Sequence, residues 1–126
     1  MSTRLRSSFG RAKPHVGKND KSQTGVVRVA AVQMASGPSI KGNLNEAKRL
    51  IQIAVEQGAK LVALPEYFAI MGMRDHAKVA LREEPGKGPI QEFLSATAKK
   101  HRIWLVGGSV PLVSSQRDKV RNSSLV

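Results

Sequence analysis

The chain contains no cysteine among its 126 residues, which excludes disulfide bonds and cysteine-ligated metal sites in this stretch. Aromatic residues make up only 4% of the chain, so few side chains could stack on nucleic-acid bases. No apolar run reaches membrane-spanning length and no signal-peptide core is visible, so we expect no membrane partner. The histidines predict no metal site, because none has a ligand partner three or four residues away: His15, His76 and His101.

Acidic residues are also scarce, with 9 Asp and Glu against 21 Lys and Arg and a formal net charge of +12. Residues 1–25 contain one acid, Asp20, and the basic residues Arg4, Arg6, Arg11, Lys13, Lys18 and Lys21. This basic N-terminal extension therefore holds five of the twelve net charges, and we predict that it is disordered. The remaining positive charge is predicted to be scattered over helix surfaces, so we expect weak, salt-sensitive contact with polyanions and no specific nucleic-acid partner.

The extension has a second interpretation as a targeting signal. Residues 2–18 are rich in Arg and Ser and contain no acid, as in a mitochondrial transit peptide. Apolar side chains recur there at helical intervals, at Leu5, Phe9, Ala12 and Val16. Pro14 interrupts this pattern, and a simple extension of a soluble protein fits equally well. We expect a cytoplasmic protein, with the mitochondrion as the alternative.

A strand, an amphipathic helix and a second strand are predicted between residues 26 and 64. Val26–Met34 is apolar and rich in valine, which favours a strand. Asn43 and Glu46 have the spacing of a capping box, and Gly58 is placed to end the helix. The helix periodicity comes from Leu44, Ala47, Leu50, Ile51, Ala54 and Val55. Because the connection is too long for a hairpin, the two strands should be parallel.

More elements are predicted beyond residue 74. We expect a short helix at Asp75–Arg82, a longer one that begins at Pro89, and a buried strand at Ile103–Val106. Ser114–Lys119 is predicted to be a polar turn, followed by a strand at Val120–Val126. The alternation of helices and strands indicates an α/β fold.

Two other motifs suggest sites but fail on inspection. Glu83 and Glu84 cannot form an acid/base pair, because adjacent side chains point apart on a helix, and beside Pro85 we expect both to face solvent. The sequence at 86–88 lacks the upstream glycine of a phosphate-binding loop, since Leu81 occupies that position. Neither motif therefore predicts a site.

The strongest functional candidate is Glu66, which follows the apolar run Leu61–Leu64 and Pro65. A run that is apolar throughout is typical of a parallel strand covered on both faces, and sites in such sheets gather at the carboxyl ends of the strands. Between Pro65, Tyr67 and Phe68, the carboxylate should be partly desolvated, as a general acid/base needs, and we expect Tyr67 and Phe68 to line a pocket. A loop glutamate that caps a helix or forms a salt bridge is the structural alternative.

Residues 26–126 resemble the N-terminal part of the nitrilase superfamily of carbon-nitrogen hydrolases, and most closely its deaminated-glutathione amidase and omega-amidase branch. The segments that carry the resemblance are the first strand at 27–34, the helix start at 42–47, the run 58–68 with Leu-Pro-Glu-Tyr-Phe, the strand at 103–109 and the strand at 121–126. The resemblance implies an α-β-β-α sandwich. It also implies a Glu-Lys-Cys triad that hydrolyses small linear amides or nitriles without metal or cofactor.

Within that triad the resemblance assigns the general base to Glu66. The lysine and the nucleophilic cysteine of the family lie further along the chain than residue 126. Because amide hydrolysis needs both a nucleophile and stabilisation of the oxyanion, we expect the 126-residue chain alone to be inactive.

A length of 126 residues holds only part of such a sandwich, so the fold should be a truncated, partial one. Unpaired strand edges and uncovered apolar faces would then favour self-association or homo-oligomers. A noncatalytic association or scaffold module, or an inactive remnant, is therefore the alternative function.

Overall fold

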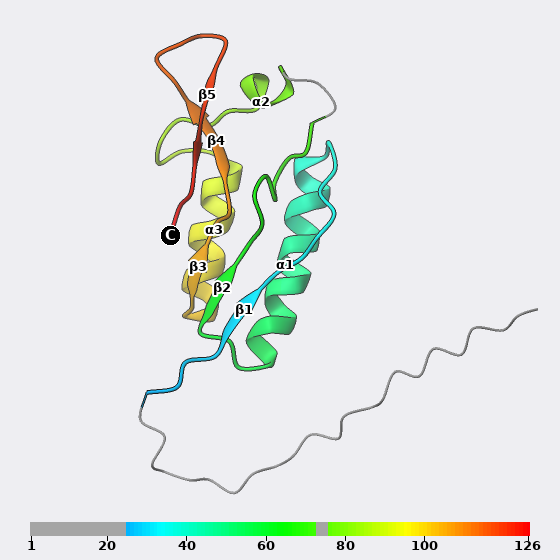
Figure 1. The fold of residues 1–126 in the computed structure, drawn as a ribbon, viewed down its shortest axis with the longest axis vertical. Coiled ribbons are helices and arrows are strands. Elements are labelled where there is room, and N and C mark those ends of the chain that lie inside the picture. The colour runs from blue at the N-terminus through cyan, green and yellow to red at the C-terminus, as the bar shows by residue number, and fades with distance from the viewer. Residues whose placement is uncertain (1–24, 73–75) are drawn as a thin grey trace, which may run out of the picture.

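The computed structural model describes residues 25–72 and 76–126, and Figure 1 shows how their helices and strands are arranged. In chain order the elements are β1 (Val29–Ala31), α1 (Ile40–Glu56), β2 (Leu61–Ala63), α2 (Ala77–Ala80), α3 (Pro89–His101), β3 (Trp104–Val106), β4 (Val110–Val113) and β5 (Val120–Ser123). The extension predicted for residues 1–25 lies outside the described residues, except for Gly25. The described part of the chain has the predicted α/β class.

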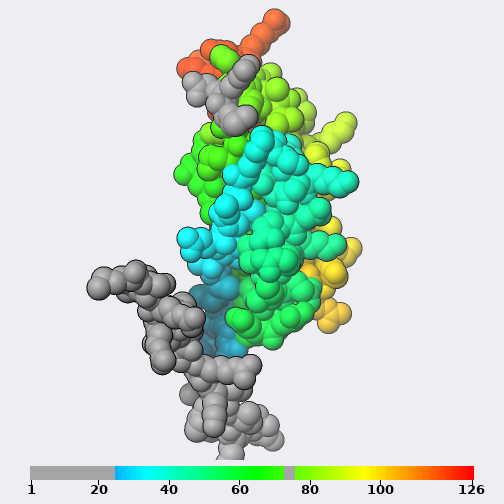
Figure 2. Space-filling model, turned by 90° about the vertical axis from the view of Figure 1, so that its right-hand side faces the viewer, coloured from blue at the N-terminus to red at the C-terminus, as the bar shows by residue number. Residues whose placement is uncertain are grey.

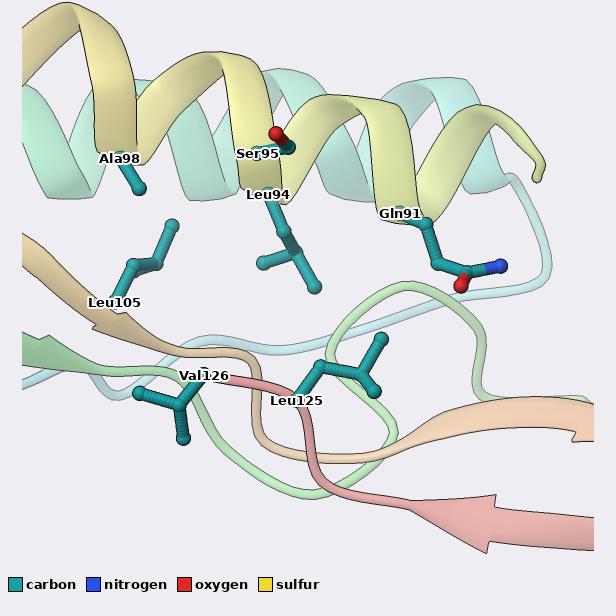
Figure 3. Close-up of a pocket in the computed structure, with 7 residues that line it drawn as sticks. All are labelled: Gln91, Leu94, Ser95, Ala98, Leu105, Leu125 and Val126. Atoms are coloured by element: carbon teal, nitrogen blue, oxygen red, sulfur yellow. The ribbon is translucent and has the colours of Figure 1, made fainter. Parts of the chain in front are cut away.

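Parallel strands form the first sheet, in the order β1-β2-β3. Val29, Leu61 and Trp104 are aligned across it. Helix α1 connects β1 to β2, α3 precedes β3, and Figure 3 shows both helices on the same side of the strands. Consecutive crossovers that move in one direction across a sheet with the same hand place their helices on one face. The predicted parallel strand-helix-strand unit is confirmed.

The hydrophobic core lies between this sheet and the two long helices. Its members include Ile51, Val62, Leu64, Phe68, Ile90, Leu94 and Leu105. Phe68 follows β2 and is fully buried, and its ring centroid lies 6.4 Å from that of Phe93 on α3. The turn after β2 is therefore anchored to the helical layer by an aromatic contact.

The other face of the parallel sheet carries apolar side chains that no described helix covers; in Figure 2, α1 (teal to green) lies beside the blue segment around β1, which forms one border of the described chain. We call it the uncovered face; its two rows are Val29, Leu61 and Trp104, then Ala31, Ala63 and Val106. Val29 is 63% exposed and Trp104 is 70% exposed. Apolar rows of this kind are typical of the inner face of a sandwich, so the helices and this sheet correspond to one half of the predicted architecture.

Helix α1 begins earlier than the sequence predicts. Ser39 is its N-cap, and the Ser39 Oγ accepts a hydrogen bond from the Gly42 N–H at 3.2 Å. The predicted cap at Asn43 is wrong, because the Asn43 side chain is buried and bonds to two loops instead of to the helix backbone. The predicted helix end is confirmed, since Gly58 has a φ of +88° just beyond the helix.

Strands β4 and β5 form a separate antiparallel hairpin around the predicted polar turn. The sequence did not predict β4, and β5 ends before the predicted limit at Val126. Strand β1 is likewise shorter than predicted, because its partner β2 ends just before Pro65, which has no N–H to continue the ladder. Helix α2 is shorter than expected, and Asp75, its predicted cap, lies outside the described residues.

The prediction that Glu83 faces solvent is wrong, whereas Glu84 is exposed as expected. The Glu83 carboxylate accepts hydrogen bonds from the Ile90 N–H at 2.6 Å, the Gln91 N–H at 3.1 Å and the Gln91 Nε2 at 3.0 Å. It thus satisfies the first amides of α3, whose N-cap Gly88 has no side chain to do so. The backbone of Glu83 also pairs with β4, which joins the hairpin to the helical layer.

We expect Glu83→Gln to lower the free energy of unfolding by about 1–3 kcal/mol. Both carboxylate oxygens of Glu83 accept hydrogen bonds, and the NH₂ group that replaces one of them in glutamine cannot accept a bond from an N–H donor. The measurement is urea unfolding followed by circular dichroism. The matched control is Glu84→Gln, which alters the neighbouring exposed carboxylate and should change stability by less than about 0.5 kcal/mol. Equal effects of the two substitutions would contradict the capping role of Glu83.

Candidate active site

Glu66 follows β2 after Leu64 and Pro65, at the carboxyl edge of the parallel sheet, as the sequence predicts. Its Oε1 accepts a hydrogen bond from the Asn122 Nδ2 of β5 at 3.1 Å. The expected partial desolvation is not observed in the described residues, because Glu66 is exposed. The buried side chain of this turn is that of Phe68, which lies in the core, whereas the Glu66 carboxylate is exposed to solvent.

The turn that carries Glu66 has an uncommon backbone conformation. Tyr67 has a φ of +52°, which is costly for a residue with a side chain. Two contacts hold it in place: the Tyr67 N–H donates to the Ser109 Oγ at 2.9 Å, and the Lys78 Nζ lies 3.3 Å from the centre of the Tyr67 ring. The direction of the adjacent Glu66 side chain is therefore set by residues far away in the sequence.

The connection between β3 and β4 passes directly against this turn. A Cβ atom added at Gly108 would lie 1.9 Å from the Pro65 carbonyl oxygen, a distance that no side chain tolerates. Gly108 also has a φ of +52°, in the left-handed region. Only glycine allows this close approach, which places Ser109 within hydrogen-bond distance of the Tyr67 amide.

The buried Asn43 joins the loops that follow β1 and β2. Its Nδ2 donates to the Gly37 carbonyl at 2.8 Å and to the Ala69 carbonyl at 2.9 Å, and its Oδ1 accepts from the Gly37 N–H at 2.9 Å. Ser36 adds a parallel link, because its Oγ donates to the Phe68 carbonyl at 2.9 Å. These bonds fix the far side of the Glu66 turn to the start of α1.

Of the predicted pocket residues, Tyr67 is half-buried and Phe68 is fully buried. A hollow of about 390 Å³ lies between α3 and the end of the described chain (Figure 3). Its lining is Gln91, Leu94, Ser95, Ala98, Leu105, Leu125 and Val126, which includes none of the candidate site residues. The pocket-lining roles of Tyr67 and Phe68 therefore stay predictions.

The structural alternative for Glu66 was a helix cap or a salt bridge. Within residues 25–72 and 76–126 the sole ion pair joins Glu46 to Arg49, at 2.7 Å, and the hydrogen bond from Arg49 lowers the pKa of Glu46. Glu66 is the first residue of its turn and caps no described helix. In the same part of the chain, no cluster of three or more His, Asp or Glu could hold a metal, and no helix is long and apolar enough to cross a bilayer.

Sequence reasoning found Glu66 but missed the residues that position it. These are Asn43, Gly108, Ser109 and Asn122. All except Asn43 come from the segments at 103–109 and 121–126, which carry the family resemblance but were given no role. A polar or glycine residue at the end of a predicted strand was the available signal, and it does not name a partner.

A carboxylate at the carboxyl edge of a parallel sheet, braced by loops from the neighbouring strands, lies where the binding sites of open α/β proteins gather. A family model of carbon-nitrogen hydrolases matches residues 28–126, and the chain belongs to that family.

Known relatives support this assignment. The chain is 35% identical over 101 residues to a deaminated glutathione amidase of Synechocystis, a match that covers 75% of the chain and 35% of the relative. It is 35% identical over 107 residues to an omega-amidase of Saccharomyces cerevisiae, with 79% of the chain and 36% of the relative covered. The chain thus spans about a third of the length of the curated relatives that it matches.

A solved structure agrees with the fold. The crystal structure of a nitrilase-superfamily member of branch 10 from Saccharomyces cerevisiae superposes with a TM-score of 0.68 at 33% identity. That match covers 78% of this chain and 38% of the yeast chain. The described residues therefore have the fold of the corresponding part of a nitrilase-superfamily protein, and the predicted superfamily is confirmed.

We expect Asn43→Ala to lower the free energy of unfolding by about 2–3 kcal/mol, because it leaves buried backbone groups of two loops without partners. Asn45→Ala, on the exposed surface of the same helix, is the control and should change stability by less than about 0.5 kcal/mol. Chemical unfolding monitored by circular dichroism measures both. If the two variants were equally stable, Asn43 would not be the link between the loops.

Proposed function

We propose that these residues form the base-bearing part of an amidase that hydrolyses small linear amides, with Glu66 as the general base. The observation that carries the proposal is the position of Glu66 at the carboxyl edge of the sheet, held by Asn122 at 3.1 Å, in a chain of the carbon-nitrogen hydrolase family. The amidase names of the relatives favour amides as the substrate class. The cytoplasm is the proposed compartment, with the mitochondrion as the alternative.

The proposed chemistry is a covalent one. A cysteine thiol attacks the amide carbonyl, Glu66 takes the thiol proton and returns it to the departing amine, and water then releases the acid from the thioester. A lysine stabilises the oxyanion that forms at each step. Neither metal nor organic cofactor has a part in this scheme.

Residues 1–126 contain no cysteine, so they cannot supply the nucleophile of this scheme. A carboxylate alone does not replace a thiolate, because the acyl-enzyme route needs a strong nucleophile as well as a base. We therefore propose that the 126-residue chain by itself is inactive and that activity belongs to a longer protein carrying these residues.

The test begins by reading the gene through and beyond codon 126 and expressing the natural product with its mass verified. A product of 126 residues should release no ammonia from linear amides above the buffer rate. A longer product with the lysine and cysteine should be active, and Glu66→Gln should lower kcat by roughly 10²- to 10⁴-fold. Glu84→Gln, a second exposed carboxylate, is the control and should keep full activity.

Either of two results would contradict the proposal. The first is amide hydrolysis by the verified 126-residue chain that Glu66→Ala abolishes. The second is a longer, active product in which Glu66→Gln and Glu84→Gln have the same kcat as the unchanged protein.

A second candidate function is favoured by the uncovered face defined above. Exposed Val29 and Trp104 lie on either side of Leu61 on an open sheet, and such a surface favours association with another chain. We propose that the 126-residue chain self-associates through this face and acts as a noncatalytic association module when it is expressed alone.

We expect the 126-residue chain to sediment as oligomers and Trp104→Lys to sediment as a monomer, because the substitution would replace the most exposed aromatic side chain of the apolar contact with a charge. Sedimentation velocity at several protein concentrations gives the measurement. Met71→Lys is the control, since Met71 is 46% exposed in the loop after the Glu66 turn and outside the uncovered face. A monomeric parent chain, or equal dissociation in both variants, would refute the proposed contact.

A further inference from the structure

Basic side chains gather at the amino-terminal edge of the parallel sheet, opposite to Glu66. Arg28 immediately precedes β1 and Lys60 immediately precedes β2. The Lys60 N–H donates to the Arg28 carbonyl at 2.8 Å, and the Trp104 N–H donates to the Lys60 carbonyl at 2.9 Å, so the strands start side by side. Neighbouring strands lie about 4.8 Å apart, which makes Arg28 and Lys60 adjacent cations at this edge.

Helix α3 brings more cations to the same end. Lys99 and Lys100 lie in its last turn, and Arg102 follows just before β3. Figure 1 shows that the carboxyl end of α3 and the starts of the strands lie together at one end of the molecule. We call the set Arg28, Lys60, Lys99, Lys100 and Arg102 the basic edge, and all of its members are exposed.

The basic edge has little opposing charge. Among the described residues, the acid at this end is Glu56, the last residue of α1, whose carboxylate accepts a hydrogen bond from the Gln52 Nε2. The five cations of the basic edge, less Glu56, leave a net charge of +4 at this end among the described residues.

This distribution corrects an expectation from the sequence. The charge outside the extension was predicted to be scattered over helix surfaces, but the fold brings five of its cations to one end. Sequence spacing could not show this, because the starts of β2 and β3 come together only through the pairing of the two strands.

We propose that the basic edge binds the phosphate backbone of a nucleic acid without reading its sequence. Cations placed along adjacent strand starts suit a linear polyanion, and each phosphate that they neutralise releases a condensed counterion. The scarcity of aromatic side chains leaves stacking on bases a minor role. A lipid surface fits less well, because Val29 and Trp104, which adjoin this edge as the first residues of β1 and β3, belong to the uncovered face, the surface proposed above to contact another chain.

Binding at the edge opposite to Glu66 does not depend on amide hydrolysis. The test is the binding of a labelled DNA duplex to the full 126-residue chain, followed by fluorescence anisotropy over a series of salt concentrations. Binding should weaken with salt, and the triple variant K60Q/K99Q/K100Q should make the slope of log K against log salt shallower by about 2 to 3. A duplex of unrelated sequence should bind equally well.

The matched control removes the same number of positive charges from the other end of the molecule, in the variant K87Q/R117Q/K119Q, whose parent residues are also exposed. This control should leave the slope nearly unchanged. The single variants Lys60→Gln and Lys100→Gln, each expected to change the slope by about 1, keep the test valid if the triple variant unfolds.

Three results would overturn the proposal. The duplex could fail to bind at low salt. The two triple variants could change the slope equally, which would make net charge, and not the basic edge, the cause. Vesicles of phosphatidylserine and phosphatidylcholine could bind through Lys60, Lys99 and Lys100 while the duplex does not, which would assign the edge to a lipid surface.

Discussion

The close contact between Gly108 and the Pro65 carbonyl is the constraint on which the candidate site depends. A Cβ at Gly108 would lie 1.9 Å from that oxygen, so the β3–β4 connection can pass against the Glu66 turn only because position 108 has no side chain. This passage brings Ser109 to the amide of Tyr67 and stabilises its positive φ. The same connection leads into the hairpin that carries Asn122, which binds the carboxylate itself.

Buried polar side chains stabilise the loops around the candidate site by forming hydrogen bonds with backbone groups that the apolar core cannot satisfy. Loops after parallel strands leave backbone N–H and C=O groups unpaired, and such groups are costly unless they find partners. Asn43 provides partners for Gly37 and Ala69, and Glu83 does the same for the first amides of α3. The carboxyl edge is therefore held by polar contacts from α1 and β4, while Phe68 holds it from within the core.

The sequence predicted the elements that have a strong period and missed those defined by distant partners. The valine-rich first strand, the helix through Ile51 and the strand before Glu66 follow from local patterns. Strand β4 was missed because Pro111 interrupts a short apolar run, and a proline argues against a paired strand. The burial of Glu83 could not be predicted, since its partner amides begin seven residues later at Ile90 and depend on the path of the intervening turn.

The exposure of Glu66 and the uncovered face have a common physical origin. A general base near neutral pH needs an environment that disfavours its charge, and a sheet with two apolar rows needs a second layer. In the described residues neither need is met: Glu66 is exposed and Trp104 is 70% exposed. A second layer packed on the uncovered face would bury Trp104 and would add residues near the edge of the sheet where Glu66 lies. In the proposed amidase, we therefore expect one second layer both to bury that face and to desolvate the base, so that the site becomes competent when the sandwich closes.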